Sequence, residues 1–124
     1  MNKHIQLLIV GAGITLILAA LFFGIPARDT GRGNLDAFAQ CLADEKITMY
    51  GANWCPHCQN EKNAFGDSFR FIPYVECPDE PKQCLDAGIS GYPTWIFPDG
   101  RRFKGEQGIE KLSQESGCAL DVRQ

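Results

Sequence analysis

An uncharged apolar run near the amino terminus limits what the rest of the chain can build. Residues 5–25 read IQLLIVGAGITLILAALFFGI, which is 21 residues without a charged side chain. As a helix this run would extend roughly 31 Å at about 1.5 Å per residue, close to the hydrocarbon thickness of a bilayer. About 95 of the 124 residues then remain, enough for one small domain with a single core.

The same run predicts a membrane anchor from Ile5 to Ile25. A cleaved signal peptide is the alternative, but its apolar region typically has about 7 to 15 residues and ends in a small-x-small site. Pro26-Ala27 matches such a site poorly. We therefore expect an uncleaved signal anchor over residues 1–27, a tether rich in glycine and charge over residues 28–33, and a folded domain over residues 34–124.

Cysteine content and charge indicate the compartment and the class of partner. Six cysteines are many for so small a domain and favour an oxidising environment. The charges flanking the apolar run hardly select an orientation, so the cysteines place the domain on the extracytoplasmic, periplasmic side. The net charge is -3 with no basic cluster, which argues against a nucleic-acid partner.

Hydrophobic periodicity and turn signals predict an alternation of helices and strands. Helices are expected over residues 35–44, 56–69, 81–88 and 109–116, with Asn34 as the first N-cap and Gly117 as the last stop. Strands are expected over residues 47–52 and 71–77, followed by a hairpin over residues 94–107 that turns at Pro98-Asp99-Gly100. This order predicts an α/β fold with a mixed sheet of about four strands flanked by helices.

The motif WCPHC, residues 54–58, carries the strongest chemical signal. Cys55 would lie at the start of the second helix, where unpaired backbone N–H groups and the helix dipole favour a thiolate. Cys58 lies one turn further on the same face, so the two sulfurs can form a disulfide. Pro56 suits the first helical turn, and His57 adds an attraction for the thiolate. A stabilised thiolate makes the disulfide a stronger oxidant, so the motif predicts a redox couple that needs no cofactor.

Other interpretations of the cysteines are less well supported. A c-type haem attachment requires His directly after the second cysteine, and Gln59 stands there. A four-thiolate zinc site in an interaction module, from Cys55, Cys58, Cys77 and Cys84, stays open, although six residues between the last two are more than usual; we assign no metal. A purely structural Cys55–Cys58 disulfide is disfavoured because so short a loop constrains the unfolded chain little.

Two segments at the correct separation, MYGANWCPHCQNEK and GISGYPTWIFPDGRRFKGEQ, resemble the thioredoxin superfamily. Residues 34–118 are more closely similar to the thioredoxin-like domain fused to bacterial and plant homologues of vitamin K epoxide reductase. The shared features are FAxCL, MYGAxWCPHC, the later cysteine pair, GYPTW and a terminal GC. The resemblance implies a thioredoxin-like fold, and the apolar run predicts one transmembrane helix before it.

The resemblance also implies roles for individual residues. Cys55 would be the attacking sulfur, Cys58 the resolving sulfur, and Pro93 the cis-proline that meets the substrate backbone. The residues that would modulate this site are Trp54, Pro56, His57, Tyr92 and Pro93, and the Pro56-His57 pair is like that of the periplasmic oxidase DsbA. Thioredoxins commonly bury an acid six residues before the first cysteine, where this chain has Met49. This departure disfavours a thioredoxin-type reductase, unless another acid such as Glu76 substitutes.

The remaining four cysteines are expected to be structural. Cys77 and Cys84 should form a disulfide around the turn between them, with a second redox relay as the alternative. Cys41 and Cys118 are candidates for a second disulfide, although Cys41 also fits a plain buried thiol on an apolar helix face.

Together these features predict a membrane-anchored thiol-disulfide oxidoreductase that oxidises the cysteines of exported proteins. The resemblance implies that a quinone-linked, vitamin K epoxide reductase-like membrane protein recharges it in trans. A reductase or isomerase with reversed electron flow is the alternative.

Overall fold

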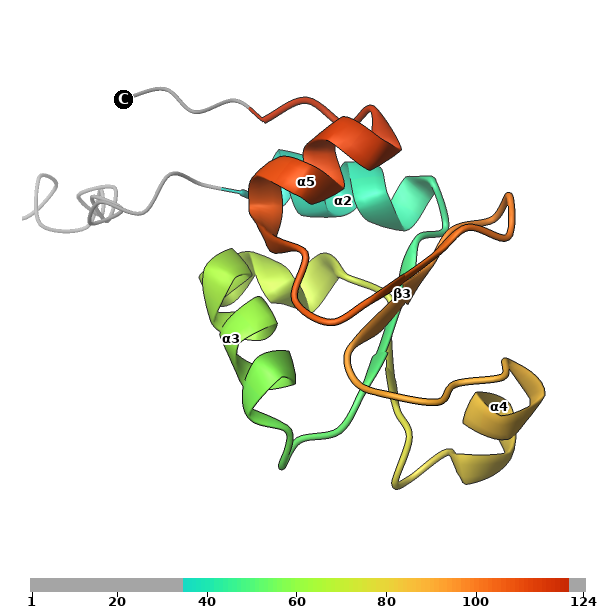
Figure 1. The fold of residues 1–124 in the computed structure, drawn as a ribbon. Helices are drawn as coiled ribbons and strands as arrows, with labels where there is room; N and C mark the ends of the chain where they lie inside the picture. Colours follow the sequence, from blue (N-terminus) through green and yellow to red (C-terminus); the bar gives the residue numbers. More distant parts are fainter. Residues whose placement is uncertain (1–34, 121–124) are drawn as a thin grey trace, which may run out of the picture. The chain divides into compact units, whose positions relative to one another are not determined.

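The computed structural model describes residues 35–120 of the chain. The predicted anchor and tether, residues 1–27 and 28–33, lie outside the described residues. Within residues 35–120, no helix combines the length and the apolar character needed to cross a membrane. The elements follow the order helix, strand, helix, strand, helix, strand, strand, helix, with a 3-10 turn after the second helix (Figure 1).

A four-stranded mixed sheet forms the centre of the described domain, with strand order β2-β1-β3-β4. β1 (Thr48–Gly51) runs parallel to β2 (Tyr74–Glu76) and antiparallel to β3 (Thr94–Ile96), which pairs antiparallel with β4 (Arg102–Lys104). The parallel pair is joined through a helix and the β3–β4 pair by a short hairpin, because only antiparallel neighbours can be linked by a tight turn. The prediction of a mixed α/β sheet is confirmed.

The helices lie where the sequence predicted them, with different ends. α2 (Asp36–Asp44) has Leu35 at the N-cap position that the sequence assigned to Asn34. α3 (Pro56–Phe65) ends before the expected residue 69, because Gly66 at φ 56° leaves helical geometry and the chain continues as the 3-10 turn η1 (Gly66–Phe71). α4 (Pro81–Asp86) is short, and α5 (Gly108–Ser116) ends at Gly117 in the left-handed region, as predicted.

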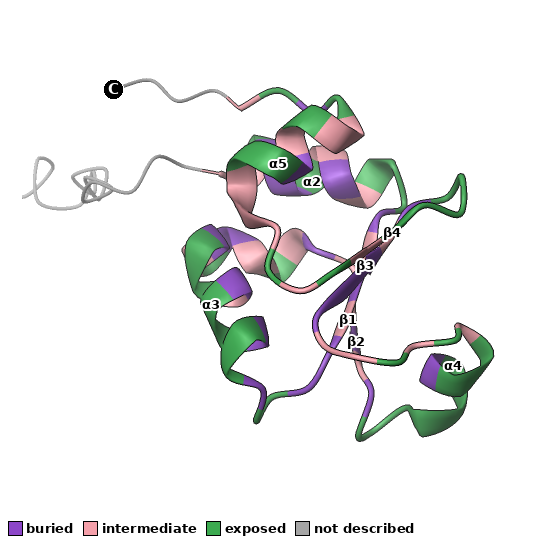
Figure 2. Cartoon of the chain, viewed as in Figure 1, coloured by how far each residue is buried: buried purple, intermediate pink, exposed green. Residues whose placement is uncertain are grey.

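Two hydrophobic clusters occupy the two faces of the sheet. Successive strand residues point to opposite faces, so Met49 and Trp95 join the larger cluster with residues of α2, α3 and α5. Val75 points the other way and packs with Cys77 and Cys84 in a smaller cluster beneath α4. Figure 2 shows the buried residues along the sheet and on the inward sides of the helices. The larger core holds β1 and α3 together, and the candidate site lies at their junction.

Candidate active site

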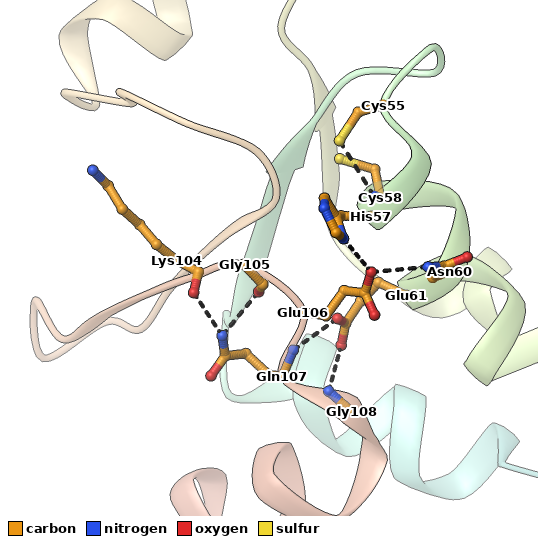
Figure 3. A network of polar contacts seen from close by, with 10 residues as sticks. All are labelled: Cys55, His57, Cys58, Asn60, Glu61, Lys104, Gly105, Glu106, Gln107 and Gly108. Carbon is orange, nitrogen blue, oxygen red and sulfur yellow. Dashed lines mark hydrogen bonds and ion pairs between the residues drawn. The ribbon is translucent and has the colours of Figure 1, made fainter.

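The two cysteines of WCPHC lie at the start of α3 as free thiols. Cys55 is the N-cap residue, and its sulfur accepts a hydrogen bond from the backbone N–H of Cys58 at 3.4 Å. Pro56 occupies the first helical turn, where a missing N–H removes no helical hydrogen bond. Figure 3 shows the two sulfur atoms facing each other at the helix end. The sequence therefore places an anion-stabilising helix terminus directly at Cys55.

The two thiols differ in their surroundings. Cys58 is fully buried, whereas Cys55 keeps 6% of its surface exposed. Burial raises the pKa of Cys58 to about 12, with further increases from the hydrogen bond and charge of Cys55. A backbone hydrogen bond at Ala52 and the charge of Lys62 oppose this rise. At neutral pH Cys58 is therefore a thiol, and Cys55 is the sulfur that solvent and a reaction partner can reach.

The loop before β3 adjoins the cysteine motif. The Tyr92–Pro93 peptide bond is cis, the conformation that the resemblance implies for this position. Trp54 is 70% exposed, and its ring meets that of Tyr92 edge to face at a centroid distance of 6.0 Å. The backbone N–H of Gly105 donates to the carbonyl of Pro93 at 2.8 Å, which ties the loop to the end of β4. The ring contact joins the two halves of the site from segments about 40 residues apart in sequence.

A polar group that the sequence did not reveal lies against His57. Nδ1 of His57 is 2.5 Å from Oε1 of Glu106, and Nδ2 of Asn60 donates to the same oxygen at 2.9 Å (Figure 3). The hydrogen bonds from Asn60 and then His57 lower the pKa of Glu106. Glu106 lies in the loop after β4, and no local pattern around it signals a link to α3.

A second acid missed by the sequence, Glu61, is buried on α3. Its carboxylate accepts the backbone N–H of Gln107 at 2.8 Å and that of Gly108 at 3.0 Å. Burial raises the pKa of Glu61 despite these hydrogen bonds. The contacts satisfy donors at the start of α5, so Glu61 fastens α5 to α3 and belongs to the fold rather than to the redox pair.

The other four cysteines form two disulfides, Cys77–Cys84 and Cys41–Cys118. The alternative of Cys41 as an unpaired thiol is therefore wrong, because the chain brings Cys118 to it after α5. The zinc site considered above is also wrong in its ligand set. Cys77 and Cys84 are joined to each other, so they cannot supply two of its four thiolates.

Gly51 leaves room for Cys58. A Cβ atom at this position would lie 2.9 Å from Sγ of Cys58 and 3.2 Å from the ring and hydroxyl of Tyr74. Neither neighbour can withdraw easily, since Cys58 is fixed on α3 and Tyr74 lies on the adjacent strand. The close approach of β1 to Cys58 thus depends on the missing side chain.

Replacing Gly51 with alanine should therefore destabilise the domain by about 1–3 kcal/mol, the usual cost of overpacking. Urea unfolding with both active-site cysteines reduced measures this change. The matched control is Gly91→Ala, because a Cβ atom at Gly91 meets nothing within 4 Å and its φ is not positive. Equal stability of the two variants would contradict the close packing around Cys58.

Comparisons with known proteins identify several sequence relatives. No family model matches the chain. The thiol-disulfide oxidoreductase LTO1 of Arabidopsis thaliana is 39% identical over 94 residues, which cover 68% of this chain and 25% of that protein. Protein disulfide isomerase-like 2-2 of Oryza sativa subsp. japonica is 35% identical over 82 residues, covering 55% of this chain and 22% of that protein.

Two further similarities are more distant. A probable protein disulfide-isomerase A6 of Medicago sativa is 30% identical over 112 residues, covering 77% of this chain and 30% of that protein. A thioredoxin of Fasciola hepatica, solved by X-ray crystallography, is 17% identical with a TM-score of 0.46, covering 66% of this chain and 91% of that one. The chain spans less than a third of the length of each curated relative named here.

The sequence relatives and the geometry lead to the same family. The cysteine pair begins a helix that follows the central strand, and a cis-proline precedes the antiparallel strand beside it. Residues 35–120 thus form a domain of the thioredoxin-like superfamily.

Proposed function

We propose that this protein is a thiol-disulfide oxidoreductase that oxidises pairs of cysteines in exported proteins. The observation that carries the proposal is the position of Cys55, a free thiol at the N-cap of α3 that accepts the Cys58 N–H beside the cis-proline loop. The names of the sequence relatives, a thiol-disulfide oxidoreductase and protein disulfide isomerases, support the same reaction class. The proposed reaction needs no cofactor, because the disulfide accepts two electrons and the resulting dithiol holds them.

The reaction proceeds by two disulfide exchanges. A substrate thiolate attacks Sγ of Cys55 in the oxidised protein, forms a mixed disulfide and releases Cys58, which takes up a proton. A second substrate thiolate then attacks the substrate sulfur bound to Cys55. The substrate leaves with a new disulfide, and the protein keeps two electrons on Cys55 and Cys58.

The direction of electron flow is proposed from the groups around the cysteines. The N-terminus of α3 favours the thiolate of Cys55, and His57 adds a positive neighbour when it is protonated. Both favour the reduced protein and therefore a disulfide that readily accepts electrons. Met49, fully buried where thioredoxins commonly have an acid, leaves the proton of Cys58 to a residue of another element.

The reduction potential of the Cys55–Cys58 couple tests this direction. It should lie above the value of about -270 mV known for thioredoxin. In His57→Ala it should fall on the order of 30 mV, about a tenfold change in the equilibrium with glutathione, because the imidazole at the start of α3 is lost and Glu106 keeps its negative charge beside that helix. The double variant His57→Ala, Glu106→Gln should recover part of the fall. A thioredoxin-like potential in the unmodified protein would favour the reductase alternative instead.

The location and the recharging partner are proposed from the sequence. We place an anchor at Ile5 to Ile25 and the domain on the extracytoplasmic side, where a membrane protein resembling vitamin K epoxide reductase would reoxidise Cys55 and Cys58. A reporter that works only outside the cytoplasm should be active when fused after Gln124. Activity of a cytoplasmic reporter in its place would overturn the orientation.

A further inference from the structure

The resolving cysteine needs a route for its proton. Under the proposed function, Cys58 changes between a thiol and a disulfide sulfur in every cycle, and it has no exposed surface. Its pKa of about 12, raised chiefly by burial, leaves almost no thiolate at neutral pH. Met49, which lies on the same face of β1 as Gly51, has no titratable group. A proton acceptor must therefore come from another element.

Tyr74 on β2 is a candidate. The parallel register places Tyr74 beside Met49 and Glu76 beside Gly51. A Cβ atom built on Gly51 would lie 3.2 Å from the hydroxyl oxygen of Tyr74. The same Cβ atom would lie 2.9 Å from Sγ of Cys58, so the hydroxyl and the sulfur adjoin the same space. Because Gly51 has no side chain, no atom of that residue separates the sulfur from the hydroxyl.

Glu76 connects this hydroxyl to the surface of the domain. The Tyr74 hydroxyl donates to Oε2 of Glu76 at 2.5 Å, and the backbone N–H of Asn53 donates to Oε1 at 2.8 Å. The carboxylate is half-buried, so it both faces the tyrosine and can exchange protons with solvent. Its second hydrogen bond comes from the turn that leads into WCPHC and fixes its direction.

The charges around the pair favour proton transfer rather than ionisation of the tyrosine. Burial and then the hydrogen bond to Glu76 raise the pKa of Tyr74, so it keeps its proton. Nζ of Lys62 lies 3.8 Å from the centroid of the Tyr74 ring and donates to Oδ1 of Asn53 at 2.9 Å. The charged and titratable groups that interact with Cys58 are Cys55 and Lys62 from the α3 side and Tyr74 from β2, and Glu76 interacts with Tyr74.

We infer that Tyr74 and Glu76 form a proton relay that serves Cys58. During recharging, Cys55 first holds a mixed disulfide with a disulfide-bearing partner. Cys58 gives its proton to the Tyr74 oxygen while Tyr74 gives its own proton to Glu76. The Cys58 thiolate attacks Sγ of Cys55, the Cys55–Cys58 bond forms, and the partner leaves as a thiolate. When Cys58 is released during substrate oxidation, the proton moves in the opposite direction.

Single-turnover oxidation of the reduced protein by glutathione disulfide separates the relay from the rest of the reaction. Cys55 first forms a mixed disulfide with glutathione, and Cys58 then resolves it; acid quenching and mass spectrometry follow both steps. Tyr74→Phe and Glu76→Gln should slow resolution about 100-fold at neutral pH, the usual size of a general acid–base contribution, and leave the first step unchanged. Tyr74→Phe keeps the ring beneath Lys62, so packing is preserved.

The pH dependence gives a readout that a purely structural role would not change. Without the relay, hydroxide must remove the proton, so resolution in the two variants should rise about tenfold per pH unit at neutral pH. In the unmodified protein the Glu76 carboxylate accepts the proton through Tyr74, so the rate of resolution should depend little on pH over the same range. The matched controls are Tyr50→Phe, whose ring packs on the other face of the sheet, and Glu80→Gln, an exposed acid near Glu76. Both should behave like the unmodified protein.

The outcomes separate this inference from the proposed function. Resolution at the unmodified rate in Tyr74→Phe or Glu76→Gln overturns the relay while the oxidoreductase function stands. Equal slowing of both steps also overturns it, because it reports general damage to the site. An unmodified protein that does not react with glutathione disulfide overturns the proposed function itself.

Discussion

Replacing Cys58 with alanine should convert the protein into a covalent trap for its partners. Cys55 still attacks or accepts a partner sulfur at the start of α3, but no internal thiol can then displace that partner. Turnover of a dithiol substrate should fall by orders of magnitude, and mixed disulfides that reductant releases should accumulate in cells. Gel electrophoresis without reductant, followed by mass spectrometry of the captured proteins, measures both.

The captured proteins test the proposed place of this protein in a redox chain. Two classes are expected: exported proteins with several cysteines, and one polytopic membrane protein with its own cysteine pair near the outer surface. The second class follows from the proposed anchor, which would confine Cys55 near the bilayer and raise its effective concentration toward a membrane partner. Removal of residues 5–25 with export retained should therefore weaken recharging more than substrate oxidation.

The double variant Cys55→Ala, Cys58→Ala is the control for the trap. It keeps both structural disulfides and should capture nothing. If Cys58→Ala captures only soluble proteins, and the form without residues 5–25 is recharged as well as the full chain, the proposal of a membrane partner is wrong. Capture by the double variant would show that another cysteine reacts.

Loss of the Cys41–Cys118 disulfide should produce the largest change in stability. This bond closes a loop with a sequence separation of 77 residues, and loop-closure entropy then predicts a loss of about 4.5 kcal/mol in Cys41→Ala, Cys118→Ala. A domain of this size usually has only about 5–15 kcal/mol of stability in total. The melting temperature should fall on the order of 20 °C, which differential scanning calorimetry or thermal circular dichroism would record.

The second disulfide supplies a matched comparison. Cys77 and Cys84 are separated by 7 residues, for which the same model predicts a loss of about 2.4 kcal/mol in Cys77→Ala, Cys84→Ala. Removal of the Cys41–Cys118 bond should therefore lower the free energy of unfolding about twice as much as removal of the Cys77–Cys84 bond. Equal losses would show that burial of Cys77 and Cys84 in the smaller cluster, rather than loop length, determines the contribution of that bond.

The sequence predicted those parts of the site whose geometry depends only on residues adjacent in the chain. Cys55 at an N-cap, Pro56 in the first turn and Cys58 one turn later are positions within one helix start, and helical geometry alone fixes their relation. The stop of α5 at Gly117 is equally local. The place where α3 ends was predicted less well, because Phe65 and Phe69 both contribute apolar side chains while Gly66 between them breaks the helix.

The contacts around the cysteine motif were decided by the tertiary structure. Glu106 is 49 residues from His57 in sequence, and only the packing of the loop after β4 against α3 brings the two together. The space beside Cys58 arises from the register of β1 with β2, which sets Gly51 next to Glu76 and so brings the Tyr74 hydroxyl near the sulfur. A residue pattern carries periodicity along the chain, whereas these contacts depend on how separate elements are placed by burial of the shared core. The sequence by itself therefore determined the dithiol motif and its helix. The folded core decided the contacts between distant segments: Glu106 with His57, the Tyr74 hydroxyl near Cys58, and Cys118 with Cys41.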